Sequence, residues 1–303
     1  MITFAQLVKK ASSRTSKPRL AIAPAQDAQL LKLLPEIEAI AEPVLIGDLK
    51  DISSILSKHG NSLDRYDSID ETDPTQAILK ARNLIIQSQA NILVQGAISN
   101  PILRDIILCS EDGLEPHCFL SHISVLESRQ LSRLVLITDS MINRKPVLKD
   151  KISILNNALN LTKAIGIDKP RVAALAALEY VNPSIQSTID AAVLSKMADR
   201  HQFADTIVEG PLDIDCAVSS QAAGRKNVSS RVGEEVDIYL VSDVESGNSF
   251  AQFMSLLGSI PMAGIIVGAR APIIVNMPYI TNQGKIVEIA LASLLYHYKN
   301  IYV

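Results

Sequence analysis

Short apolar runs alternate along this chain with segments in which apolar residues recur at helical spacing. The runs have the length of buried strands, and the spaced segments predict helices that pack against them. The expected strands are residues 19–23, 43–47, 91–95, 171–175, 236–241, 263–269 and 271–275. The expected helices are residues 4–8, 26–34, 49–59, 74–87, 101–108, 147–165, 187–200 and 286–292. Strands and helices that alternate in this way predict an α/β protein with a mostly parallel sheet and helices on both of its faces.

Three other segments carry a different signal. Residues 120–126 and 131–138 each alternate polar and apolar side chains, which predicts a half-exposed, antiparallel pair of strands. Residues 64–73 are acidic and rich in turn-forming residues, which predicts a loop. Ser187 and Thr188 stand at the start of the helix 187–200 and are expected to cap it.

Size and composition set the broad class. A chain of 303 residues with 48% hydrophobic residues is long enough for two domains of common size. Its net charge is −3, from 29 basic and 32 acidic residues without long runs, so neither a nucleic-acid partner nor a membrane surface is expected. No apolar run approaches the ~20 residues of a membrane-spanning helix. Cys109, Cys118 and Cys216 have no paired spacing, which predicts reduced thiols and a cytoplasmic protein.

Acidic residues and glycines follow the expected strands in the second half of the chain. Residues 209–215 and 243–248 each place carboxylates beside a glycine at a strand end, where open α/β sheets form clefts. A role in a cleft and plain turn chemistry both remain open for these loops. Four cations lie in or near them: Arg225, Lys226, Arg231 and Arg270. Together they could bind an anion, although each alone is equally consistent with a solvated surface residue.

Other kinds of site find little support. Ser121 and His122 are adjacent in an expected strand, so their side chains point to opposite faces and cannot act on each other as nucleophile and base. The five histidines show no metal-ligand spacing, and no metal site is expected. The glycines form neither a dinucleotide fingerprint nor a phosphate-binding loop of the nucleotide type.

The order of these segments resembles the phosphate acetyl/butyryltransferase family, and the phosphate butyryltransferases most closely, over essentially the whole chain. The segments that carry the resemblance are residues 120–125, 179–183 with 187–192, 209–212 with 215–219, 243–248, 263–270, 272–273 and 285–292. The resemblance implies two three-layer α/β domains with mostly parallel sheets that flank a deep cleft, as in isocitrate and isopropylmalate dehydrogenases. The first domain is expected to comprise residues 1–140 and 264–303, and the second residues 141–263.

The resemblance also implies an enzyme, a phosphate acyltransferase that transfers a short or branched acyl group between CoA and inorganic phosphate. This reaction needs groups that bind phosphate, donors to the thioester oxygen and a path for a proton to the CoA sulfur. The expected partners are acyl-CoA and phosphate, and CoA is a substrate rather than a cofactor. No cofactor or metal is expected, and the chain is expected to form a homodimer.

The candidate site residues come from the segments that carry the resemblance. The expected catalytic residues are Asn276, Thr281 and Arg270. The residues expected to bind substrate are Asp215, Glu245, Gly247, Asn248, Ser121 and His122. No metal ligand is among them.

Some positions differ from the polar residues of the family pattern. These positions are Gln95, Gln252, Met277, Pro278 and Ile280, where the pattern has two lysines, a Ser-Arg pair and an aspartate. Met277 and Pro278 have no side-chain donor, and Ile280 cannot accept a proton. An alternative interpretation is therefore a family member that binds CoA or acyl phosphate in a regulatory role without catalysing the transfer.

Overall fold

The structure is a computed structural model that describes residues 2–107, 114, 119–128 and 130–301. The chain forms two compact units. We call them the terminal unit, Phe4–Leu120 with Ala263–Val303, and the middle unit, Met1–Thr3 with Ser121–Met262. The expected division kept the chain up to residue 140 in the first domain, whereas the segment from Ser121 onward belongs to the middle unit.

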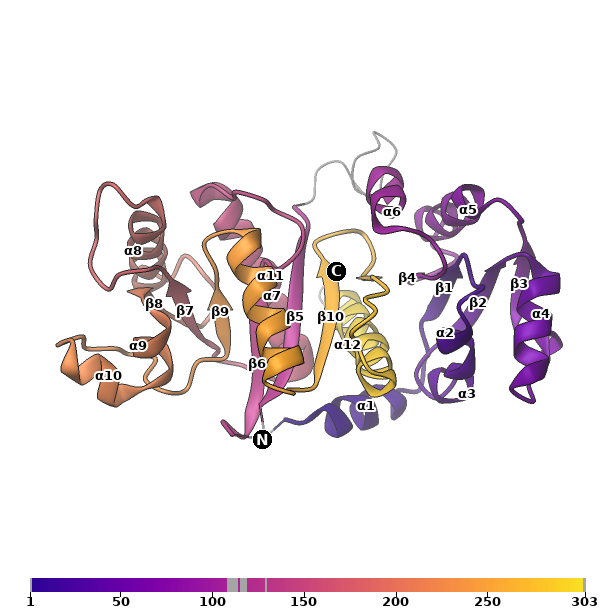
Figure 1. The fold of residues 1–303 in the computed structure, drawn as a ribbon, viewed down its shortest axis with the longest axis horizontal. Helices are drawn as coiled ribbons and strands as arrows, with labels where there is room; N and C mark the ends of the chain where they lie inside the picture. The colour runs from indigo at the N-terminus through magenta and orange to yellow at the C-terminus, as the bar shows by residue number, and fades with distance from the viewer. Residues whose placement is uncertain (1, 108–113, 115–118, 129, 302–303) are drawn as a thin grey trace. The chain divides into compact units, whose positions relative to one another are not determined.

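The terminal unit is built around a sheet in the order β3-β2-β1-β4-β11-β10. Its strands are β1 (Arg19–Ala23), β2 (Glu42–Gly47), β3 (Asp67–Asp70), β4 (Ile92–Gln95), β10 (Met262–Val267) and β11 (Ile273–Ile274). Its helices are α1 (Phe4–Ser12), α2 (Ala28–Lys32), α3 (Leu34–Ile37), α4 (Leu49–Lys58), α5 (Pro74–Ile86), α6 (Asn100–Ile107) and α12 (Asn282–Ile301), with a 3-10 turn at Leu63–Arg65. These neighbouring strands pair in parallel, except that β10 and β11 are antiparallel. Helix α1 packs against α12, so the first and last helices of the chain share this unit (Figure 1).

The strand order of the terminal unit reverses at β1. The chain adds β2 and β3 on one side of β1 and then returns to place β4 on the other side. Because such crossovers are right-handed, α2 to α4 cover one face of the sheet and α5 covers the other. The strands β1, β4 and β11 run in the same direction, so their carboxyl ends lie at one edge. Open α/β sheets bind ligands at this edge, where the strand order reverses.

The middle unit has a sheet in the order β5-β6-β9-β7-β8. Its strands are β5 (Ser121–Ser128), β6 (Arg133–Thr138), β7 (Arg171–Leu175), β8 (Ile207–Leu212) and β9 (Ile238–Leu240). Its helices are α7 (Leu148–Ile165), α8 (Gln186–Asp199), α9 (Ile214–Val218), α10 (Ser220–Arg225) and α11 (Val244–Gln252), and α11 continues into a π-helical turn at Phe253–Leu257. The strands β6, β9, β7 and β8 are parallel, so their carboxyl ends also share an edge, while β5 is antiparallel to β6.

The expected α/β class with mostly parallel strands is confirmed. The strands at 19–23 and 171–175 have the predicted bounds, and the long helix α7 ends where expected, at Gly166 with a φ of 102°. Among the residues described here, no helix is both long enough and apolar enough to cross a membrane.

The acidic segment 64–73 was wrongly predicted to be a loop. It contains β3, which pairs with the outer side of β2 through its backbone. Three of its four side chains are exposed, because β3 lies at the end of the sheet. An edge strand of this kind has no apolar face, so the pattern that reveals the other strands is missing from its sequence.

The antiparallel pairing of β5 with β6 is confirmed, but the two strands are not half-exposed. Nearly every residue of both strands is buried. The polar side chains that suggested exposure, such as Ser121, His122 and Ser124, form hydrogen bonds inside the unit instead. Buried polar groups with partners produce the same alternating sequence as a strand that faces water.

Two predicted helices differ in detail. The helix expected at 26–34 is interrupted, because Pro35 lacks a backbone N–H and stands in the first turn of the separate helix α3. Ile185, rather than Ser187 or Thr188, stands at the N-cap position of α8, and its side chain makes no capping hydrogen bond. The Thr188 hydroxyl donates back to the carbonyl of Ile185 at 2.7 Å.

Candidate functional site

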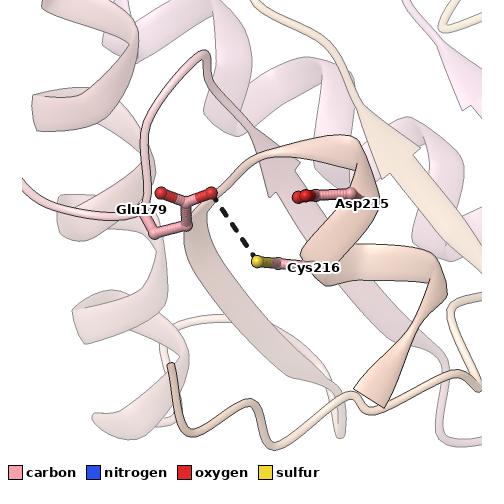
Figure 2. A group of neighbouring side chains, drawn as sticks. All are labelled: Glu179, Asp215 and Cys216. Carbon is pink, nitrogen blue, oxygen red and sulfur yellow. Dashed lines mark hydrogen bonds between the residues drawn. The ribbon is translucent and has the colours of Figure 1, made fainter. Parts of the chain in front are cut away.

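Acidic side chains of the middle unit gather at the carboxyl edge of β7 and β8. Glu179 lies in the segment after β7, and Asp213 and Asp215 lie directly after β8. Because the two strands are parallel neighbours, the segments that follow them leave the sheet side by side. Figure 2 shows that the side chains of Glu179, Asp215 and Cys216 point toward one another.

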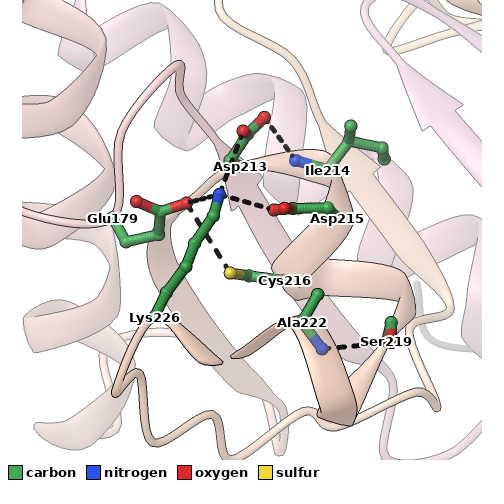
Figure 3. Close-up of polar contacts among 8 residues, drawn as sticks. All are labelled: Glu179, Asp213, Ile214, Asp215, Cys216, Ser219, Ala222 and Lys226. Carbon is green, nitrogen blue, oxygen red and sulfur yellow. Dashed lines mark hydrogen bonds and ion pairs between the residues drawn. The ribbon is translucent and has the colours of Figure 1, made fainter. Parts of the chain in front are cut away.

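Lys226, which follows α10, places its ammonium group between these carboxylates (Figure 3). Its Nζ lies 2.5 Å from Glu179 Oε1, 2.8 Å from Asp215 Oδ1 and 3.4 Å from Asp213 Oδ2. The hydrogen bonds from Lys226 are the largest cause that lowers the pKa of Glu179 and of Asp215, and the same bonds raise the pKa of Lys226. One lysine therefore balances three carboxylates in a partly solvated cluster, which we call the Lys226 cluster.

Cys216 adjoins the Lys226 cluster, and its thiol stays protonated near neutral pH. Its thiol donates to Glu179 Oε1 at 3.6 Å, and burial, aided by Asp215, raises the pKa of the thiol to about 11. Glu179, Asp215 and Cys216 have ligand atoms within 4.8 Å of one another, yet the ammonium of Lys226 occupies the position of a cation. Cys216 is a free, buried thiol, and Cys109 and Cys118 lie outside the described residues.

Ser121 and His122 lie on opposite faces of β5, as predicted. Ser121 Oγ accepts a hydrogen bond from Asn157 Nδ2 of α7 at 3.0 Å. His122 Nδ1 lies 2.7 Å from Ser140 Oγ, which lies 2.9 Å from Ser124 Oγ. Burial lowers the pKa of His122 to about 4, so its imidazole is neutral near pH 7. Both side chains are buried, and their binding of substrate stays a prediction.

The turn after β6 is organised by the carboxylate of Asp139. It accepts backbone hydrogen bonds from His122, Met141, Ile142 and Asn143. Gly247 of α11 packs directly on this turn, where a Cβ would lie 2.3 Å from the carbonyl oxygen of Asp139. The absence of a side chain at Gly247 therefore allows the close approach of α11, which is a packing reason for this glycine.

Asn248 and Glu245 occupy the same helix with different surroundings. Asn248 Nδ2 donates to the carbonyl of Ser140 at 3.2 Å, and its Oδ1 accepts from Gln252 Nε2 at 2.8 Å. Glu245 is exposed in the first turn of α11. Asn248 and Gly247 thus adjoin the turn after β6, whereas Asp215 belongs to the Lys226 cluster.

In the terminal unit, Asn276 follows β11 at the carboxyl edge of the sheet and is held from three directions. Its backbone N–H donates to Gln95 Oε1 at the end of β4, at 3.0 Å. Its Nδ2 donates to Asp27 Oδ2, after β1, at 2.6 Å. Its Oδ1 accepts from Lys285 Nζ, in the first turns of α12, at 2.9 Å. The elements that meet where the strand order reverses are therefore joined through one asparagine.

A small cavity lies beside Asn276, with about 10 Å³ of space for the centre of a water molecule. Its lining residues are Gln95, Asn276, Lys285, Glu288, Leu30, Val94, Ile274 and Ile289. Glu288 is buried, and its Oε1 accepts from the backbone N–H of Gly264 at 2.9 Å. Burial raises the pKa of Glu288 to about 8, against the opposing effects of Gly264 and Lys285. We call the four polar residues that line this cavity, Gln95, Asn276, Lys285 and Glu288, the Glu288 site.

The loop between Asn276 and α12 turns apolar side chains into the interior of the unit. Met277 and Ile280 are buried, and the hydroxyl of Tyr279 donates to Met277 Sδ at 3.1 Å. Pro278 is exposed. Thr281 is also exposed, and its Oγ1 accepts from the backbone N–H of Gly284 at 3.2 Å, so it caps the first turn of α12.

Arg270 lies at the other edge of the same sheet. It precedes β11, whereas Asn276 follows it, and the strand separates the two residues by roughly 20 Å of extended chain. Arg270 lines a different cavity, of about 320 Å³, together with Asn91 and Tyr296. The structure thus places Asn276 and Thr281 at one edge, and does not bring Arg270 to them.

The three candidate cations of the middle unit do not converge on one point. Lys226 donates to the carboxylates of the Lys226 cluster. Arg231 donates to Glu209 Oε2 at 2.9 Å and to Asp199 Oδ1 at 2.5 Å. Glu209 lies within β8 rather than in the loop after it. Arg225 is exposed at the last position of α10, and Arg270 belongs to the terminal unit.

Sequence reasoning missed the roles of Asp27, Lys285 and Glu288. Lys285 and Glu288 are the charged residues of the mostly apolar stretch 285–295, and their spacing of three places them on one face of α12. Charged residues on a helix face that is otherwise apolar are seldom buried without a partner. That pair was the available signal, whereas nothing in the sequence around Asp27 marks its contact with Asn276.

Comparison with known proteins gives a match over nearly the full length of the chain. The family model described as phosphate acetyl/butaryl transferase matches residues 68–293. A phosphate butyryltransferase of Clostridium acetobutylicum is 35% identical over 97% of this chain and 98% of its own length. The chain belongs to the phosphate acetyl/butyryl transferase family.

Solved structures show the fold of this family member. The structure of a branched-chain phosphotransacylase from Enterococcus faecalis V583 aligns with a TM-score of 0.78 and 24% identity, over 92% of this chain and 99% of that one. A 4-hydroxythreonine-4-phosphate dehydrogenase from Klebsiella pneumoniae aligns with a TM-score of 0.55 and 13% identity, over 93% of this chain and 100% of that one. The predicted likeness to a dehydrogenase type of α/β fold is therefore confirmed at the level of fold.

Proposed function

We propose that this family member is a phosphate acyltransferase that transfers a short or branched acyl group between CoA and inorganic phosphate. The observation that carries the proposal is its identity of 35% with a phosphate butyryltransferase over 97% of the chain. In the reaction, a phosphate oxygen bonds to the thioester carbon, the bond from that carbon to sulfur breaks, and the proton of the phosphate passes to the CoA sulfur. The chain must therefore bind an anion and provide a path for one proton.

The carboxyl edge of the terminal unit supports this proposal. Thr281 carries an exposed hydroxyl at the start of α12, where helix N–H groups favour an anion. Lys285 brings a cation to the next turn, beside Asn276. We propose that substrate binds at this edge, with Asn276 and Thr281 nearest to the reacting atoms.

The direct test is release of free thiol from butyryl-CoA in the presence of phosphate. We expect release that depends on phosphate and continues in the presence of a metal chelator. Glu42→Gln is the control variant, because Glu42 is exposed at the start of β2, at the other edge of the sheet. If acetyl-, butyryl- and isobutyryl-CoA all release no thiol above the rate without protein, the proposed function is wrong.

Thr281→Ala and Arg270→Ala separate the two edges of the terminal unit. Removal of the Thr281 hydroxyl is expected to lower kcat/KM by about tenfold or more, as loss of one transition-state donor does. Arg270→Ala is expected to have the smaller effect. The larger loss with Arg270→Ala would place the reaction at the edge that carries the 320 Å³ cavity. Thr281→Ser, which keeps the hydroxyl, should recover the rate.

A second candidate function is binding of CoA or acyl phosphate without transfer. It is favoured by the loop after Asn276, in which Met277 and Ile280 are buried and supply no polar group. In this case CoA should raise the melting temperature of a preparation that releases no thiol, by mass action on the folded state. A preparation with neither property would exclude both functions.

We further propose that the chain acts as a homodimer in the cytoplasm. Phe253, Leu256 and Leu257, in the turn that extends α11, have exposed fractions of 63%, 55% and 74%. Three adjacent apolar side chains on a surface commonly mark a protein interface. The free thiol of Cys216 agrees with a reducing compartment. Leu257→Asp should convert a dimer to a monomer in sedimentation, and a monomeric wild-type protein would contradict the proposal.

A further inference from the structure

We propose that Glu288 is the proton carrier of the transfer, acting through one water molecule in the cavity that it shares with Gln95, Asn276 and Lys285. The inference rests on the proposed function and adds a residue to it. Glu288 comes from the interior of α12 rather than from the loop 276–281. The buried side chains of that loop, Met277 and Ile280, are apolar and cannot exchange a proton with a substrate.

The position of Glu288 suits this role. It is buried at the carboxyl edge of the terminal unit, with one carboxyl oxygen fixed by the N–H of Gly264 in β10. Lys285 lies one turn earlier on the same helix face and reaches Asn276. The carboxyl is thus held in place by one oxygen and borders the cavity next to the residue that we propose nearest to the reacting atoms.

The cavity has the size and polarity for one water molecule. Its volume of about 10 Å³ for the centre of a water molecule is close to what a single buried water requires. Four of its lining residues are polar, and a buried water commonly makes about three hydrogen bonds. A water there can pass a proton between Glu288 and a substrate at the mouth of the cavity, which direct contact with a buried carboxyl would not allow.

The charged groups around Glu288 make both of its protonation states accessible. Burial favours the neutral acid and raises the pKa of Glu288 to about 8, while the N–H of Gly264 and the cation of Lys285, on the same helix, favour the carboxylate. The phenol of Tyr279, in the loop before α12, has a raised pKa, mainly because it is buried and to a smaller extent because of Glu288. Asp27, which follows β1, accepts a hydrogen bond from Asn276 Nδ2. A general acid or base works best with a pKa near the working pH.

The step balances without a further reactant. As the bond from carbon to sulfur breaks, neutral Glu288 gives its proton through the water to the CoA sulfur and becomes a carboxylate. The phosphate oxygen that has bonded to the acyl carbon gives up its proton, and this proton returns to Glu288. The reverse direction passes through the same states: neutral Glu288 gives its proton to the phosphate oxygen, and the resulting carboxylate takes the proton of the CoA thiol. Both directions therefore start from the neutral form of Glu288.

The test is the pH profile of kcat in both directions for wild-type protein and Glu288→Gln. Glutamine keeps the volume and can still accept from Gly264, but it carries no exchangeable acid proton. We expect kcat to fall by about 100-fold or more in the variant. In the wild type, kcat should fall as pH rises through a limb near pH 8 in both directions, because both start from neutral Glu288. Both limbs should be absent from the variant.

The outcomes separate this inference from the proposed function. If the wild type and the Glu42→Gln control are active and Glu288→Gln keeps their rate and both limbs, Glu288 is structural and the inference is wrong. If the wild type releases no thiol, the proposed function fails, and the inference fails with it.

A second measurement does not depend on activity. The infrared carbonyl band of a protonated carboxyl should titrate with a midpoint near 8 in the wild type and be missing from Glu288→Gln. Lys285→Met should move this midpoint to higher pH, because it removes the cation that favours the carboxylate. A midpoint in the ordinary range of a glutamate would overturn the inference even in an active enzyme.

Discussion

The Lys226 cluster of the middle unit and the Glu288 site of the terminal unit combine the same groups, a lysine and carboxyl side chains, in opposite environments. In the Lys226 cluster, direct hydrogen bonds to the ammonium lower the pKa of Glu179 and Asp215, and the lysine side chain keeps 37% of its exposure. In the Glu288 site, Lys285 donates to Asn276 and only acts on Glu288 through its charge, and burial raises the pKa of Glu288 to about 8.

The difference shows that burial and direct pairing decide what a carboxyl can do. A solvated carboxylate that is bonded to a cation stays ionised at all pH values near neutrality and cannot exchange a proton there. A buried carboxyl whose nearest cation is occupied elsewhere titrates close to neutral pH. The Lys226 cluster therefore fixes the segments after β7 and β8 in place, while the Glu288 site has the property that proton transfer requires.

The largest expected effect is the change of folding stability with pH that Glu288 causes. The pKa of Glu288 is about 8 in the folded chain and ordinarily 4.5, so the folded state holds an extra proton between these values. Folding stability should fall as pH rises through this window, by about 5 kcal/mol. Glu288→Gln should match the wild type near pH 5 and be more stable above pH 8 in urea unfolding. Equal pH slopes for both proteins would contradict the raised pKa.

His122 provides the opposite case of a buried base, and its effect should be next in size. Burial lowers its pKa from 6.5 to about 4, so the unfolded chain binds a proton that the folded chain does not. Stability should fall as pH drops from 6.5 toward 4, by about 3 kcal/mol. His122→Asn, whose amide can still meet Ser140, should lose this acid sensitivity in the same unfolding assay. An unchanged acid slope would show that His122 is solvated or paired in solution.

The smallest effect is expected from Lys226→Met, because the cluster is partly solvated. The loss of the cation should raise the pKa values of Glu179 and Asp215 and lower the melting temperature slightly, and about 1 M salt should remove most of the difference. The variant should also gain stability from Ca²⁺, since Glu179, Asp213 and Asp215 would then face an unfilled cation position. The wild type serves as the control, and a large loss of stability that salt does not change would contradict the comparison.

Much of the fold could be predicted, because buried strands and helices with one apolar face leave a periodic sequence. The strands β1, β4 and β7 and the helices α5 and α7 are of this kind. The edge strand β3 escaped prediction because its exposed side chains leave no pattern, and β5 was misjudged because its polar side chains are paired inside the unit.

The site could be predicted less well. Asn276 and Thr281 follow a strand in sequence, so their place at the carboxyl edge was predictable. Arg270 precedes β11 and Asn276 follows it, so their separation was predictable from the strand expected at 271–275. The partners of Asn276 and Glu288 come from segments far apart in the chain, such as Asp27 and Gly264, and only the folded structure brings them together.

The measurement that tests the central claim most directly is thiol release from butyryl-CoA by the wild-type protein, with and without phosphate, at pH values on both sides of 8. A phosphate acyltransferase should release thiol only with phosphate, and the rate should fall as pH rises through the limb assigned to Glu288. No release at any pH, or release that does not require phosphate, would contradict the claim.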